Sequence, residues 1–398
     1  MCLCVCSSSL GEENPDRGSD GRVGPTIELN LLPDPDAAHP FNHSAETMVT
    51  ARAGRVVVTY INLHFDSASD FTLADEADFR KQAAVAVSTD RGVTYSEARP
   101  LGHPMSTDPV VRLAADGTLW ASTIDSSFVD HAEWRVDLWR SPDLGQSFTR
   151  LLHEGPDADK GWLALDDVDG SAYLADVTGY YKVSFAGNVL ATHSNGSRVL
   201  DAYTDPAGAH FLTESFQARL WDGSADPTAE GSALSTGKGD GYPLYCAAMG
   251  PTADGGQWIA RTIWTSSATL QVVLRVRHLP EDAGTDRPIG PEASFYPAGA
   301  LDGEGRLHLA WYESAGVHGV LKYARSLSAD LTLGFCEPRM IDADACPGGG
   351  WLPEFDTASG GRRLREYIGV AVDGRRAHIA WTHAPAAPSR VRTMYVDF

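Results

Sequence analysis

The sequence lacks any run of 18 apolar residues, which is the length that a membrane-spanning helix needs. It is also poor in basic residues: 32 lysines and arginines stand against 53 aspartates and glutamates, which gives a net charge of −21. A surface this acidic repels phosphate groups, so nucleic acid and anionic membranes are excluded as the main partners. The same charge favours the binding of cations.

Cysteine is scarce and unevenly placed. The six residues are Cys2, Cys4, Cys6, Cys246, Cys336 and Cys346. The first three do not have the C-x-x-C spacing of zinc sites, and no histidine stands near them, so we expect no metal there. Cys336 and Cys346 would form a local disulfide if the protein is exported and would be free thiols otherwise.

Residues 1–24 contain small, polar and charged residues with almost nothing to bury, and we predict that they form a flexible tether. A cysteine followed by serines and then by such a tract (CSSS at 6–9) resembles the mature start of a bacterial lipoprotein. This resemblance implies a secreted or lipid-tethered, extracytoplasmic protein. A cytoplasmic location is the alternative, because only five residues precede Cys6 and a lipoprotein needs a signal peptide there.

No helical pattern of useful length occurs, and the strongest signal is an internal repeat. A short alternating strand, a turn with Asp-Gly or Ala-Gly, and a second apolar or aromatic strand recur seven times. Such turns favour glycine because they require a positive φ. The turn glycines are Gly54, Gly117, Gly170, Gly208, Gly255, Gly305 and Gly374. Their mean separation is about 53 residues, close to the roughly 40 to 55 residues of a four-stranded propeller blade.

The repeat therefore predicts an all-β fold, a seven-bladed β-propeller that forms a single domain over residues 25–398. A six-bladed ring is the alternative. The last blade offers only three strands, near 367–372, 376–382 and 391–397. We predict that the alternating segment at 25–33 (PTIELNLLP) supplies its outer strand, because this closes the ring and covers an exposed edge.

Two blades contain a sharper motif. Residues 88–95 (STDRGVTY) and 141–148 (SPDLGQSF) both fit S-x-D-x-G-x-x-aromatic, and 326–335 (SLSADLTLGF) is a weaker copy. The motif resembles the Asp box of sialidases and other BNR-repeat proteins. Its aspartate can accept hydrogen bonds from its own turn, its glycine adopts a special dihedral, and its aromatic residue packs between sheets. These residues are structural and do not indicate catalysis.

The ligand face of a propeller is built from the loops that enter each inner strand and those that follow each second strand. The residues that begin the predicted inner strands are Glu46, Asp108, Asp201, Tyr245, Tyr296, Glu366 and Tyr367. An acidic, tyrosine-rich mouth suits sugars, because carboxylates accept hydrogen bonds from hydroxyl groups and aromatic faces stack on C–H groups. Alternatively, these residues only hydrate a solvent channel.

Two long loops, at 64–80 and 343–367, are predicted to face each other across the junction of blades one and seven. Long loops on a rigid scaffold often carry function. The first loop is acidic, and most of its carboxylates are expected to be simply solvated. The second loop contains Trp351 and Arg365, and Arg365 is a candidate anion clamp.

Histidines are frequent in the predicted upper-face segments. These are His39, His43, His64, His103, His131, His318 and His383. Neutral imidazoles near carboxylates could hold a divalent metal or act in acid–base catalysis. No compact ligand motif accompanies them, so no cofactor is assigned, and simple exposure is the alternative.

The resemblance to sialidases covers most of residues 45–398. Sialidases hold the substrate carboxylate with three arginines, attack with a tyrosine that a glutamate activates, and use an aspartate as acid/base. Arg365, Glu366 and Tyr367 stand at the right kind of place for these roles. The family's early F/Y-R-I-P motif is absent, and FNHSAE (41–46) stands where its arginine is expected.

We predict a monomeric propeller that binds or processes a carbohydrate or glycoconjugate at its upper mouth. The catalytic candidates are Tyr367, Glu366, Asp108 and His43, and the substrate-binding candidates are Arg365, Tyr296, Glu46, Asp201 and Trp351. Two alternatives stay open. One is a non-catalytic propeller that binds a glycan or protein outside the cell. The other is a uronate polysaccharide lyase or a metal-dependent enzyme that uses the upper-face histidines.

Overall fold

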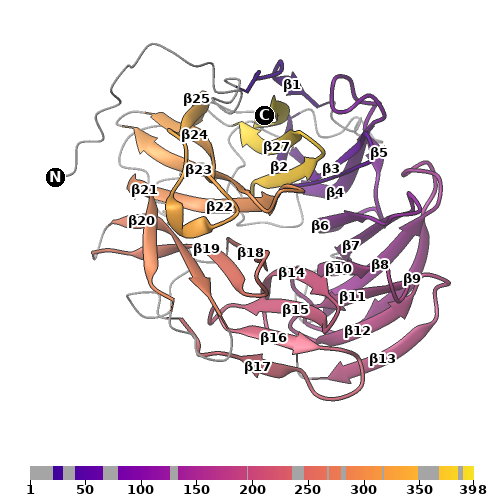
Figure 1. Ribbon diagram of the computed structural model, residues 1–398. Helices are drawn as coiled ribbons and strands as arrows, with labels where there is room; N and C mark the ends of the chain where they lie inside the picture. Colours follow the sequence, from indigo (N-terminus) through magenta and orange to yellow (C-terminus); the bar gives the residue numbers. More distant parts are fainter. Residues whose placement is uncertain are drawn as a thin grey trace, which may run out of the picture.

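Seven four-stranded antiparallel sheets surround a central axis in the computed structural model, which confirms the predicted seven-bladed β-propeller (Figure 1). The inner strands contact one another around the ring, and the last of them lies against the first. The structure describes residues 21–29, 41–65, 79–125, 133–194, 196–234, 246–266, 269–278, 284–315, 318–347, 367–383 and 389–398.

The strands follow the chain outward in each blade, from the inner strand to the outer strand. Blade one contains β2 (Phe41–Arg52), β3 (Arg55–Phe65), β4 (Phe79–Ser88) and β5 (Arg99–Pro100). Blade two contains β6 (Ser106–Leu113), β7 (Leu119–Asp125), β8 (Arg135–Ser141) and β9 (Thr149–Glu154). Blade three contains β10 (Trp162–Asp166), β11 (Ser171–Ala175), β12 (Gly179–Ser184) and β13 (Val189–Ser194). Blade four contains β14 (Val199–Asp205), β15 (Gly208–Thr213), β16 (Ala218–Trp221) and β17 (Thr228–Glu230).

The remaining blades follow the same order. Blade five contains β18 (Ala247–Pro251), β19 (Gln257–Trp264), β20 (Leu270–Arg277) and β21 (Asp286–Glu292). Blade six contains β22 (Ser294–Leu301), β23 (Leu307–Ala315), β24 (His318–Arg325) and β25 (Arg339–Pro347), with the short 3₁₀ helix η4 (Leu331–Leu333) between the last two. Blade seven contains β26 (Gly369–Asp373), β27 (Arg376–His383) and β28 (Arg390–Asp397), and its fourth strand is β1 (Ile27–Glu28).

All seven glycines of the repeat lie where the sequence predicted them, at the turn that joins the first and second strands of their blades, with Gly208 as the first residue of β15. Each has a positive φ, from 61° at Gly374 to 138° at Gly208. Residues with a Cβ atom rarely adopt a backbone conformation with positive φ, so the glycines determine where these hairpins turn.

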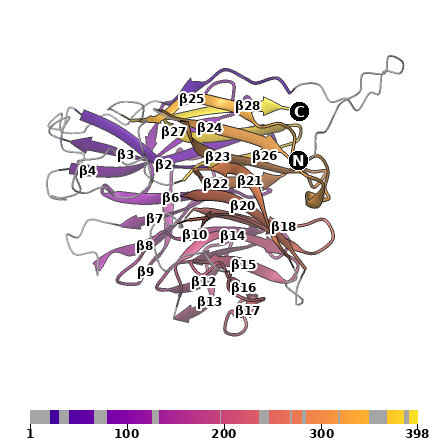
Figure 2. The ribbon, with the colours of Figure 1, turned by 90° about the vertical axis from the view of Figure 1, so that its left-hand side faces the viewer.

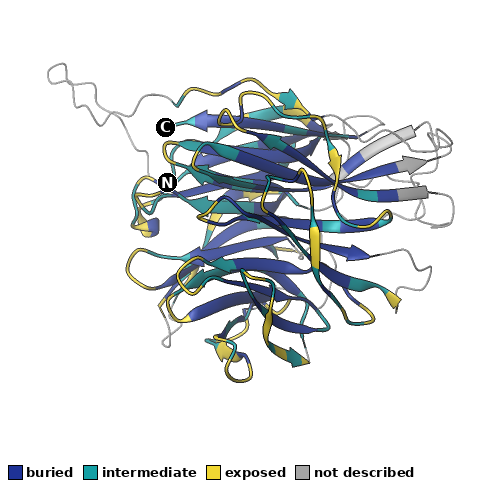
Figure 3. Ribbon diagram, turned by 90° about the vertical axis from the view of Figure 1, so that its right-hand side faces the viewer, coloured by how far each residue is buried: buried dark blue, intermediate teal, exposed yellow. Residues whose placement is uncertain are grey.

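The core lies between neighbouring blades. The second strands supply large side chains: Trp120, Trp258, Trp311 and Trp381 are buried on β7, β19, β23 and β27. Figure 3 shows the inner parts of the sheets buried and the loops at their ends exposed. The blades therefore hold one another in a rigid ring, on which loop and strand-end residues can be positioned.

Closure of the ring uses the N-terminal segment, as predicted. β1 pairs antiparallel with β28, with Ile27 opposite Thr393, and Leu29 N donates a hydrogen bond to Val391 O. The side view of Figure 2 shows this indigo segment beside the yellow end of the chain. Residues 1–20, which contain most of the predicted tether, lie outside the described residues.

Deleting residues 1–29 is expected to lower the free energy of unfolding by about 2–3 kcal/mol, because the buried Leu29 side chain would be lost. The outer edge of β28 would also be exposed, which promotes association between molecules. Urea unfolding and size-exclusion chromatography measure the two effects. Deletion of residues 1–20 alone is the control, and equal behaviour of both deletions would contradict the role of β1.

The two S-x-D-x-G turns form hydrogen bonds within themselves. Asp90 accepts from the backbone N–H and hydroxyl group of Thr94, and Asp143 accepts from the same groups of Ser147. These bonds lower the pKa of both carboxyls to about 2. Tyr95 reaches from blade one to β28, where its hydroxyl group lies 3.4 Å from that of Thr393.

Cys246 is buried and Cys336 half-buried, and the side chain of Cys346 is outside the described residues. Within the described ranges, no helix has the length and apolar character needed to cross a membrane.

Candidate functional site

Four predicted mouth residues share an unusual backbone conformation. Glu46, Asp108, Tyr296 and Tyr367 have φ values of 55°, 50°, 53° and 85°. In β2, β6 and β22 the residue lies at a shift in the strand register, and Tyr367 stands just before β26. Positive φ is strained for residues other than glycine, and such residues cluster at functional sites. The starts of these inner strands are therefore specialised positions.

The half-buried Asp108 belongs to a group of four charged residues, the mouth cluster, with the buried Glu46, Lys81 and Lys160. Burial alone would raise the pKa of Asp108, but a hydrogen bond with Glu46 and the charges of Lys160 and Lys81 outweigh it and hold the pKa below its usual value. Lys160 is only 4% exposed and Lys81 only 6%. Lysines are rarely buried to this extent unless a charge compensates them, so the two lysines and the two carboxyls stabilise one another.

Aromatic rings cover one side of the mouth cluster. The Lys160 ammonium lies 3.2 Å from the centre of the Tyr367 ring and 5.4 Å from that of Trp162. The two rings contact each other edge to face, with their centres 6.1 Å apart. Cation–π contacts of this kind fix the position of the lysine and of both rings.

Below these rings, a central cavity of about 340 Å³ follows the channel between the inner strands, and Trp162 and Tyr367 contribute to its wall. Asp201 and Arg112 also line it, 3.6 Å apart. Asp201 accepts a hydrogen bond of 2.8 Å from Met249 N. Burial raises the pKa of Asp201 to about 6, although Arg112 and the backbone donors oppose the shift. The cavity volume falls in the range of small-molecule sites, about 300–1,000 Å³.

The structure brings some of the predicted residues together and leaves others apart. Glu46, Asp108 and Tyr367 meet around Lys160, and Asp201 lines the central cavity under Tyr367. Tyr296 is buried and packs edge-on against Phe295. Arg365, Glu366, Trp351 and Tyr245 lie outside the described residues, as do most of the two long loops (66–78 and 348–366). For His43 the structure describes only the backbone, on β2.

Two of the upper-face histidines are described with their side chains, and each faces a carboxylate: His383 on blade seven faces one on β25 of blade six, and His103, just before β6, faces the one that ends β7. His383 Nδ1 lies 2.7 Å from Asp342 Oδ2, and His103 Nδ1 lies 3.8 Å from Asp125 Oδ1. The side chains of His64 and His318, like that of His43, and all of His39 and His131 are outside the described residues.

Sequence reasoning missed Lys81, Lys160, Arg112 and Trp162. A signal existed for two of them: Lys160 and Trp162 stand at the start of inner strand β10, so the mapping used for the other blades would have selected them. Lys81 lies on the third strand of its blade and Arg112 next to the end of β6, where no local pattern marks them.

No protein-family model matches the chain, and no curated protein does. Many solved structures are similar, and among them are the following three. A protein of unknown function from Dyadobacter fermentans has a TM-score of 0.58 at 12% identity, over 95% of this chain and 99% of that one. A fungal alcohol oxidase of the AA5 family, in complex with copper, has a TM-score of 0.58 at 10% identity, over 95% of this chain and 76% of that one. The GH93 α-L-arabinofuranosidase of Fusarium graminearum, in complex with arabinobiose, has a TM-score of 0.50 at 12% identity, over 94% of this chain and 98% of that one.

The likeness shows the fold. The chemistry of these propellers differs from one to the next, so function has to be argued from the residues of this chain. The resemblance to sialidases remains a prediction at the level of the family.

Proposed function

We propose that the protein hydrolyses a glycosidic bond at the upper end of its central channel, with Asp201 as proton donor and Asp108 as the ionised carboxylate. One observation carries this: the pKa values of the two half-buried carboxyls move in opposite directions, up to about 6 for Asp201 and down for Asp108. Trp162 and Tyr367 connect the two, because both rings line the cavity of Asp201 and both contact Lys160, whose charge acts on Asp108. Carboxyl pairs whose environments separate their pKa values divide acid and base roles.

Each group has a task in this reaction. Asp201 protonates the leaving oxygen, while Asp108 stabilises the positive charge that develops on the sugar ring or activates the attacking water. The rings of Trp162 and Tyr367 provide apolar faces for the C–H groups of a sugar. Glu46 cannot be the second carboxylate, because it is hydrogen-bonded to Asp108 and glycosidases need a separation of about 5–9.5 Å. Its role is to hold Asp108 in place.

The test is mass spectrometry of products after incubation with sialosides, neutral glycans including arabino-oligosaccharides, and uronate polysaccharides. A product that has gained one water supports hydrolysis. An unsaturated uronate would show the lyase alternative instead. If every substrate stays intact while a glycan array shows binding, the proposal of catalysis fails and the propeller is a binding module.

The pH dependence gives a sharper prediction. Above about pH 6, kcat/KM should fall about tenfold per pH unit, because Asp201 loses its proton there. The positive charge of Arg112 opposes the raised pKa of Asp201, so Arg112→Met should move this falling limb to higher pH. Arg306→Met, at an ion pair with Glu304 outside the cavity, is the control. An unchanged limb in Arg112→Met would contradict the assignment of Asp201.

A further inference from the structure

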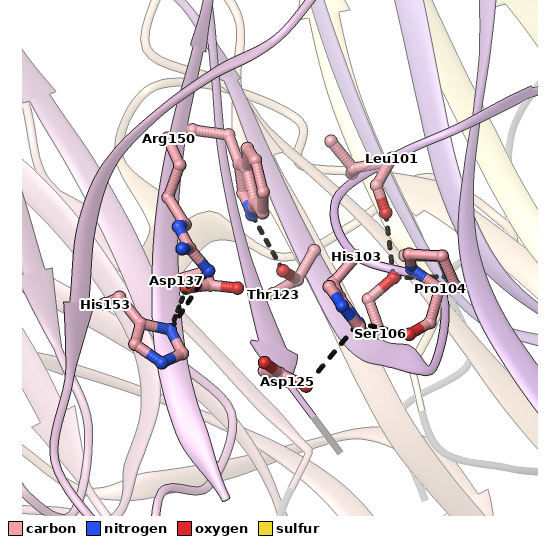
Figure 4. A network of polar contacts seen from close by, with 11 residues as sticks. Leu101, His103, Pro104, Ser106, Thr123, Asp125, Asp137, Arg150 and His153 are labelled. Atoms are coloured by element: carbon pink, nitrogen blue, oxygen red, sulfur yellow. Dashed lines mark hydrogen bonds and ion pairs between the residues drawn. The ribbon is translucent and has the colours of Figure 1, made fainter. Parts of the chain in front are cut away.

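Three potential metal ligands converge on one face of blade two, at the end of its sheet. Asp125 ends β7, Asp137 lies on β8, and His153 lies on β9. Asp137 pairs directly with His153 on one side and with Thr123 on the other, two residues before Asp125. Residues two apart on a strand point to the same face, so the register places all three side chains together (Figure 4).

The distances suit one ion. One ligand atom from each residue can be chosen so that all three lie within 4.8 Å of one another. His153 Nδ1 lies 2.7 Å from Asp137 Oδ1, and Figure 4 shows Asp137 between His153 and Asp125. None of the three lines the central cavity.

Asp137 supplies a second and independent observation. Its side chain is fully buried, and its Oδ2 atom has no hydrogen-bond partner among the residues that the structure describes. Arg150 Nη1 and His153 Nδ1 both approach the other oxygen, Oδ1, at 3.6 Å and 2.7 Å. A buried carboxylate oxygen without a partner is costly, and a cation bound to it would remove that cost.

We propose that Asp125, Asp137 and His153 bind one divalent transition-metal ion. Two carboxylates balance the charge of a divalent cation, and an imidazole nitrogen favours zinc-like ions over calcium or magnesium. Three protein ligands leave a fourth tetrahedral position open. His103, which faces Asp125 and is 46% exposed, stands next to the site and could fill this position. The half-exposed His153 and His103 leave the ion a path from solvent.

The test is isothermal titration calorimetry of the chelator-treated protein with Zn²⁺ at pH 7.5. The protein carries Cys2→Ser, Cys4→Ser and Cys6→Ser, so that these three thiols do not compete for the ion. One ion should bind per chain. His153→Gln and Asp137→Asn should each weaken binding at least tenfold, and His153, at a side-chain exposure of 32%, can be replaced with little risk to folding.

His193→Gln is the matched control. His193 lies on the outer strand β13, and its Nδ1 atom is 3.1 Å from Asp226 Oδ1. Among the described residues, no third metal ligand joins this pair. The substitution should leave the affinity unchanged. X-ray absorption of the zinc complex should show nitrogen and oxygen ligands at about 2.0–2.2 Å. Absence of stoichiometric binding, or equal affinity in His153→Gln and His193→Gln, would overturn the proposal.

Discussion

Asp108→Asn is expected to lower kcat by about 10²–10⁴-fold for the glycan that the product assay identifies, with the fold unchanged. A positioned acid or base typically contributes this factor. The exchange removes the charge but keeps the shape, and asparagine tolerates the positive φ of 50° at this position. The loss should appear in kcat more than in KM, because the carboxylate acts on charge that develops in the transition state.

Asp226→Asn serves as the control for this variant, because Asp226 is 89% exposed between β16 and the outer strand β17 of blade four and does not line the central cavity. It should retain full activity. Thermal unfolding of both variants checks that the mouth cluster still folds. If Asp108→Asn kept most of its activity, Asp108 would have only a structural role with Lys81 and Lys160, and the acid–base assignment would fail.

The architecture was predictable because its signals are local. A turn such as Ala-Asp-Gly at 115–117 specifies a hairpin from three adjacent residues, and seven of them at blade spacing specify the ring. The strand supplied by 25–33 followed from counting, since the last blade was one strand short. What could not be predicted locally is the shift in register at Glu46, Asp108 and Tyr296, which depends on packing around the axis.

The site was predictable only where position in the repeat decides the location of a residue. Glu46, Asp108 and Tyr367 were found because the repeat places each at the start of a predicted inner strand; in the structure Glu46 and Asp108 lie inside β2 and β6, and Tyr367 stands just before β26. Lys81 was missed because its long side chain reaches the mouth cluster from the third strand of blade one. The group of Asp125, Asp137 and His153 was missed for a related reason: its members lie on three successive strands, and only the pairing register brings them together.

His378 is expected to make the propeller sensitive to acid. Its ring is buried on β27, and within the described part of the chain both ring nitrogens lack hydrogen-bond partners. Burial, with a smaller effect of the Arg376 charge, lowers its pKa from the usual 6.5 to about 4. Between these values the unfolded chain takes up a proton and the folded chain does not. The free energy of unfolding should therefore fall as the pH drops from 6.5 to 4, by about 3 kcal/mol at about 1.4 kcal/mol per pKa unit.

His378→Phe tests this, because phenylalanine keeps a buried ring that cannot take up a proton. Urea unfolding of both proteins at pH 7.5, 5.5 and 4.5 measures the difference. The variant should be at least as stable as the original at pH 7.5 and should gain on it at each lower pH. Comparing the two proteins cancels the opposite contribution of Asp176 and Asp201, whose pKa values of about 6 favour the folded state in acid. Parallel stability curves would show that the buried imidazole is not the origin of the acid sensitivity.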